Sequence, residues 1–154
     1  MRTRSAAAAL AATTLAGAAT FGSIAQASPA HHGGATLRLT GTVVSFHAVP
    51  DRPSGAPQRA GDETFFVVKL SRDGRTVGRA PHHCVAADAR YSLCTSVADL
   101  RRGQISLETA LLPTTKVATV AVTGGTGAYR GVTGELDLTQ RSDGTISWVF
   151  HLSR

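Results

Sequence analysis

From residue 37 to the end of the chain, apolar positions recur at every second residue or in short β-branched runs, with turn residues between them. The last segment shows this alternation clearly, since Ile146, Trp148, Phe150 and Leu152 are separated by single polar or smaller residues. No window carries a sustained helical stripe with a capping residue in front of it. The pattern predicts an all-β domain with strands at 37–46, 63–70, 76–86, 91–98, 104–111, 116–123, 132–140 and 146–152.

The connections between these strands are mostly short, and Asp73-Gly74 and Asp143-Gly144 are typical hairpin turns. The segment 47–62 is an exception, because its length and its prolines are typical of a lid, a binding loop or a disordered segment, and we expect it near one mouth of the domain. Eight strands joined in sequence can close on themselves and leave no exposed edge. The chain is therefore predicted to form a closed eight-stranded antiparallel up-and-down β-barrel, with an open sandwich as the alternative.

Alternation also predicts which side chains face the inside of the barrel. The large residues assigned to the lumen are Ile105, Leu107, Leu136, Leu138, Ile146, Trp148, Phe150, Tyr91 and Leu93. Glu108, Glu135 and Asp137 alternate with inward leucines, so we expect them on the outer face. Arg79 is placed in the lumen or on its rim.

The first 27 residues have the features of a secretory signal peptide. Arg2 and Arg4 precede an apolar stretch, and Ala25-Gln26-Ala27 forms a small-x-small cleavage site. A membrane anchor is the alternative, but it needs roughly 20 strongly apolar residues, and polar residues interrupt this run. We therefore expect cleavage near Ala27, a flexible segment at 28–36, one barrel domain at 37–154 and an extracellular location.

Charge and cysteines narrow the partners and the compartment. The formal net charge is +6, but the arginines are scattered and not interleaved with aromatic residues, so no nucleic-acid partner is predicted. No run after residue 27 is long and apolar enough to span a membrane. Cys84 and Cys94 are equidistant from Asp88-Ala89-Arg90, so a hairpin centred there would place them opposite each other. In an exported protein this spacing favours a disulfide, and two free thiols are the alternative.

Other motifs fail as catalytic or cofactor sites. The glycine-rich segment 124–131 lacks both the spacing of a dinucleotide fingerprint and the lysine of a phosphate loop. His82 and His83 are adjacent in a strand, so they point to opposite faces and cannot chelate one metal ion together. The sequence contains no Gly-x-Ser-x-Gly elbow. No metal and no cofactor are predicted, and no catalytic residue is identified.

Three motifs resemble the barrel shared by allene oxide cyclases and dirigent proteins. The segment 77–80 is similar to a dirigent third-strand motif, 83–85 and 90–106 resemble the middle of allene oxide cyclases, and the corner 121–136 resembles both. The resemblance implies a ligand cavity in the lumen, with Phe46, Tyr91, Trp148, Phe150 and Arg79 as candidate contacts. Cys84 falls where the cyclases carry a cavity cysteine. Phe46 stands near the position of a glutamate that the cyclases use, and the chain contains no asparagine.

The resemblance implies a secreted barrel that binds a hydrophobic small molecule and steers its cyclisation or coupling, as an isomerase or cyclase would. A non-enzymatic carrier or structural barrel is the alternative. The first function predicts an open lumen with a few inward polar groups, and the second predicts a lumen filled by large side chains. Val117, Ala121 and Val149 are small or β-branched residues of the outer face, which favours a homo-oligomer.

Overall fold

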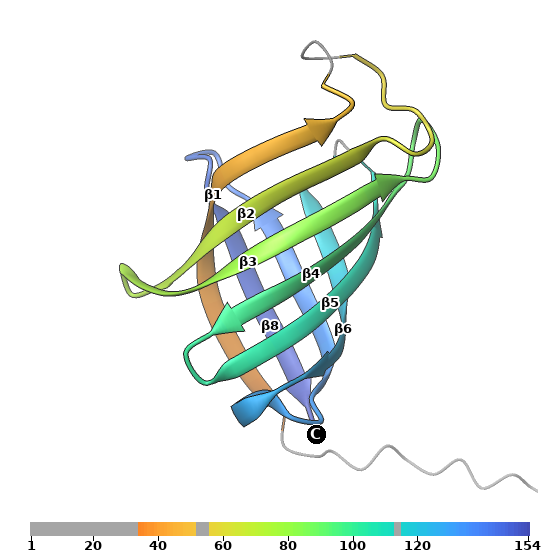
Figure 1. The fold of residues 1–154 in the computed structure, drawn as a ribbon. Helices are drawn as coiled ribbons and strands as arrows, with labels where there is room; N and C mark the ends of the chain where they lie inside the picture. The colour runs from red at the N-terminus through yellow and green to blue at the C-terminus, as the bar shows by residue number, and fades with distance from the viewer. Residues whose placement is uncertain (1–33, 52–55, 113–114) are drawn as a thin grey trace, which may run out of the picture. The chain divides into compact units, whose positions relative to one another are not determined.

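The computed structural model describes residues 34–51, 56–112 and 115–154. These residues form a closed barrel in which each strand pairs with the next along the chain and β8 pairs with β1 (Figure 1). All pairings are antiparallel. The predicted fold class is confirmed. The predicted signal peptide lies outside the described residues. So does most of the segment 28–36, although its last two residues belong to the first strand.

Each predicted strand is present, and most strand ends lie within a few residues of the predicted positions. The elements are β1 (Ala35–Val49), β2 (Glu63–Arg72), β3 (Arg75–Ala86), β4 (Ser92–Leu100), β5 (Gly103–Leu111), β6 (Val117–Gly125), the 3-10 helix η1 (Gly127–Tyr129), β7 (Thr133–Gln140) and β8 (Ile146–Ser153). The first strand extends three residues further than predicted, so the long loop starts at Pro50. No helix among the described residues is long and apolar enough to cross a bilayer.

The glycine-rich corner closes one end of the barrel. Its 3-10 helix η1, which the alternation did not predict, lies beside the turn between β4 and β5, and the Ala128 N–H donates to the Arg102 carbonyl at 2.8 Å. Gly103 has a φ of +138°, and a Cβ there would stand 2.1 Å from the Thr126 carbonyl oxygen. Only glycine allows this backbone approach. Tyr129 then packs against the core and closes this end.

The hydrophobic core fills the same half of the barrel. Its largest fully buried side chains come from β2, β5, β7 and β8: Trp148, Phe150, Leu70, Ile105, Leu136 and Val68. The inward assignments of Ile105, Leu107, Leu136, Leu138, Ile146, Trp148 and Phe150 are confirmed. The opposite half of the barrel is open. It is surrounded by the C-terminal end of β1, the β3–β4 turn and the β7–β8 turn.

The first strand leaves its neighbour part-way along the barrel. Its pairing with β8 ends at Gly41 and Ile146, whereas its pairing with β2 continues to Val49 and Glu63. A bulge between Val43 and Ser45 bends the strand at this point. Figure 1 shows the far half of β1 diverging from β8. Beyond Gly41, β1 is therefore paired with β2 alone.

Candidate functional site

The open half of the barrel contains a cavity of about 470 Å³. Its apolar lining consists of Phe46, Phe66, Val68, Leu107, Leu111, Leu112, Ala118, Val120, Leu136, Leu138, Ile146 and Trp148, with the Cys84–Cys94 pair on one wall. Its polar lining consists of Gln58, Thr64, His82, Ser92, Ser96, Thr109, Thr115, Lys116 and Gln140. Both the volume and this mixture are typical of pockets for small organic ligands, which measure about 300–1,000 Å³.

An aromatic cluster forms the floor of the cavity. The ring of His82 stacks on Phe66, with 4.3 Å between the ring centroids and 8° between the planes. Its edge contacts Trp148 at a centroid distance of 5.7 Å, and Trp148 in turn packs on Phe150 at 6.0 Å. Ser96 Oγ lies 3.4 Å from His82 Nε2. The floor therefore offers flat apolar surfaces beside two polar groups, the His82 imidazole and the Ser96 hydroxyl.

His82 is uncharged at neutral pH. Burial lowers its pKa from 6.5 to about 4, because the apolar floor cannot solvate the imidazolium. A neutral imidazole carries one N–H donor and one nitrogen acceptor. The group can therefore hydrogen-bond a ligand without adding charge to the floor.

A disulfide forms part of the cavity wall. Cys84 of β3 and Cys94 of β4 are directly opposite each other, and their sulfur atoms are bonded at 2.05 Å. The predicted disulfide is confirmed, and the alternative of two free thiols is wrong. Because both cysteines face the lumen, every second residue on either side of them in these strands faces it too.

The described part of the long loop reaches the rim of the cavity, as predicted. Gln58 Nε2 donates to the Asp88 carbonyl at 2.9 Å, and Gln58 Oε1 accepts a hydrogen bond from Ser92 Oγ at 3.2 Å. The Asp88 carboxylate accepts from the N–H groups of Arg90 and Tyr91, and these bonds lower its pKa. The loop is thus tied to the β3–β4 turn at the mouth.

The barrel, its hollow half and its motifs agree with one family. The model of the family described as "Allene oxide cyclase barrel like domain" matches residues 42–147. The chain belongs to this family. No curated protein sequence matches it significantly.

Three solved structures similar in fold share low sequence identity with this family member. A pyocyanin demethylase is 24% identical with a TM-score of 0.68, over 77% of this chain and 100% of that chain. A pterocarpan synthase dirigent protein is 17% identical with a TM-score of 0.62, over 79% and 95%. An exo-specific intermolecular Diels-Alderase is 16% identical with a TM-score of 0.60, over 77% and 97%.

The predicted ligand contacts fall into three groups in this family member. Trp148 lines the floor, and Phe46 lines the mouth, although 67% of its surface is exposed because β1 diverges there. Phe150 lies in the lumen but beneath Trp148, in the packed half. Tyr91 and Arg79 are exposed and do not line the cavity, so their assignment to the lumen is wrong.

Strand parity explains these errors. Arg79 differs by an odd number of positions from Cys84, which faces the lumen, so it faces outward. Leu93, also predicted inward, precedes Cys94 directly and is 60% exposed. Tyr91 lies before β4, where its N–H and carbonyl close the turn. Hydrophobicity misled the assignment because the lumen side of β4 carries small residues that line a cavity.

Sequence reasoning missed two functional candidates, His82 and Lys116. From the sequence, His82 is considered only as a possible metal ligand, and the described residues contain no cluster of three or more His, Cys, Asp or Glu side chains that could hold a metal ion. Its spacing of two from Cys84 was the signal that it faces the lumen. Lys116 similarly stands two residues before Ala118, a lumen residue. In both cases, a spacing of two residues predicts a lumen-facing side chain once one inward position of the strand is known.

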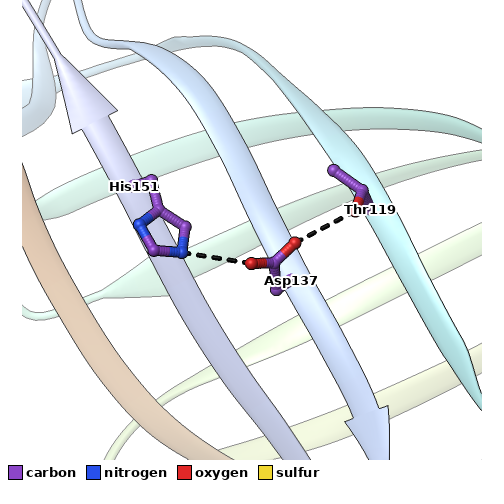
Figure 2. Close-up of polar contacts among 3 residues, drawn as sticks. All are labelled: Thr119, Asp137 and His151. Carbon is purple, nitrogen blue, oxygen red and sulfur yellow. Dashed lines mark hydrogen bonds and ion pairs between the residues drawn. The ribbon is translucent and has the colours of Figure 1, made fainter.

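The acidic residues of β7 lie on the outer face, as predicted. Asp137 Oδ1 accepts a hydrogen bond from Thr119 Oγ1 at 3.0 Å, and Asp137 Oδ2 lies 3.1 Å from His151 Nε2 (Figure 2). These three residues connect β6, β7 and β8 across the outer wall. Glu108 and Glu135 are also exposed and outside the lumen. The cluster stabilises the wall and does not face the cavity.

Proposed function

We propose that this barrel binds one apolar small molecule in its lumen and steers its cyclisation or coupling by confinement. The observation that carries the proposal is the hollow half of the barrel. A cavity of about 470 Å³ lies above a packed aromatic floor, and most of its lining is apolar. An apolar molecule gains roughly 25 cal/mol for each Å² of surface that it removes from water there.

The chemistry of the lining supports steering by shape. The described lining residues include no carboxylate, and the imidazole of His82 is neutral at physiological pH. General acid–base catalysis by a strong group is therefore not supplied by these residues. Holding reacting atoms close together in a favourable orientation can by itself remove about 7–11 kcal/mol from a barrier in the best cases. The flat rings of Phe66, His82 and Trp148 provide surfaces that could fix a planar ligand.

The names of the fold relatives agree with this class of function. A dirigent protein named as a pterocarpan synthase and a Diels-Alderase, whose reaction closes a ring, have the same barrel. The alternative of a purely structural barrel is less consistent with the cavity, because such a barrel requires side chains to fill the whole lumen. Here they fill only the closed half. A carrier would use the same cavity without turnover, so the experiment must measure both binding and conversion.

Trp148 makes the binding test direct, because it is the single tryptophan and lies on the cavity floor. Its emission should change with saturable one-to-one titration when planar apolar compounds are added. Ala118 also lines the cavity, and Ala118→Phe should fill it and abolish the response without unfolding the barrel in circular dichroism. A flat response to every compound would overturn the proposal. Compounds that bind but emerge unconverted by mass spectrometry would indicate a carrier instead.

A further inference from the structure

The mouth of the cavity carries one positive charge. Lys116 is the only charged side chain among the described lining residues. The other titratable side chain of this lining, His82, is neutral at physiological pH. It directly precedes β6 and has the same parity as Ala118 and Val120, which face the lumen. The Gln140 N–H donates to the Lys116 carbonyl at 2.8 Å and holds this part of the backbone at the rim.

No described residue of the lining offsets this charge. Asp and Glu are absent from the described lining, and no ion pair of Lys116 is found among the described residues. Apolar walls of low dielectric concentrate the field of such a charge inside a cleft. Within the described lining, the one charged side chain therefore favours anions over cations at the entrance.

The floor of the cavity favours an uncharged, apolar part of a ligand. Trp148, Phe66 and Val68 are apolar, and His82 resists protonation there. Burying an unpaired charge against these residues would be costly. A charged ligand group is thus stable at the mouth and unstable at the floor, which sets a direction for the ligand along the barrel axis.

From these observations we infer that the lumen selects apolar organic anions. The carboxylate or sulfonate of the ligand pairs with the Lys116 ammonium at the mouth, and its apolar body extends toward Trp148. This inference rests on the proposed function and deepens it by naming the ligand class and its orientation. Lys116 is a specificity-determining residue in this arrangement.

Two fluorescent probes with a shared aromatic body test the inference. 1-Anilinonaphthalene-8-sulfonate carries a sulfonate, and N-phenyl-1-naphthylamine lacks it. Both accept excitation energy from tryptophan, so transfer from Trp148 reports occupation of the lumen. Lys116→Gln should weaken sulfonate binding about fivefold, the upper range for an exposed ion pair, and leave the neutral probe unchanged. Lys116→Arg should preserve sulfonate binding.

Lys69 provides the matched control, because it is the chain's only other lysine and lies on β2 outside the cavity lining. Lys69→Gln removes the same net charge and should not change the ratio of the two affinities. If Lys116→Gln changes that ratio less than twofold, or Lys69→Gln changes it equally, the selection of anions is wrong. If neither probe binds, or both still bind when Ala118→Phe or Thr109→Phe fills the cavity, the proposed function itself fails.

Discussion

The half-buried imidazole of His82 makes the barrel's stability depend on pH. Its pKa is about 4 in the folded protein and 6.5 when exposed, because the cavity floor disfavours the imidazolium. Between these values the unfolded chain binds a proton that the folded chain does not. The contribution of the uncharged His82 to the free energy of unfolding is therefore retained above pH 6.5 and is lost as the pH falls toward 4.

The size of this loss follows from the two pKa values. Between pH 7 and pH 5 the linkage relation gives a loss of about 2 kcal/mol from this single group. That is a substantial fraction of the roughly 5–15 kcal/mol that stabilises an ordinary domain. Other groups also titrate in this range, so the contribution of His82 must be isolated by comparing variants.

Guanidinium unfolding followed by circular dichroism at pH 7 and pH 5 provides the measurement. We expect wild-type protein to lose about 2 kcal/mol more than His82→Gln over this interval. His47→Gln, which removes an exposed imidazole outside the cavity, should behave as wild type. If wild type and His82→Gln lose equal stability, then water in the cavity solvates the imidazolium and the argument from burial is refuted.

Two further predictions concern packing and the covalent link. A Cβ at Gly41 would lie 2.6 Å from Trp148 Nε1, so Gly41→Ala should cost about 1–3 kcal/mol in urea unfolding and shift the tryptophan emission. Gly124→Ala is the control, because a Cβ added at Gly124 would meet no neighbouring atom within 4 Å. An equal loss of stability in both variants would contradict the predicted collision at Gly41. Replacing Cys84 and Cys94 together by alanine should cost about 2–3 kcal/mol, because the link closes a loop of 10 residues in the unfolded chain. If the free energy of unfolding of the wild-type protein is the same in reducing and oxidising buffer, the disulfide does not make this contribution.

Local patterns were sufficient to predict the strands and the order in which neighbouring strands pair. Period-two alternation and Asp-Gly turns are properties of neighbouring residues, and each hairpin pairs segments that are close in sequence. The same locality predicted the Cys84–Cys94 link, because both residues belong to one hairpin. The 3-10 helix at 127–129 was missed, since it forms where the corner meets the distant turn at Arg102 and Gly103.

The sequence by itself determined the eight strands, their hairpin order and the outer position of Glu135 and Asp137, because alternation and turn spacing act locally. It favoured the closed barrel and the disulfide, which the tertiary structure then decided over the sandwich and the free thiols. Only the tertiary structure decided which half of the lumen is hollow. That outcome depends on the summed volume of the side chains that all eight strands direct inward. It also decided that small residues of β4 face the cavity while Leu93 faces outward, and that His82 and Lys116 define the floor and the mouth.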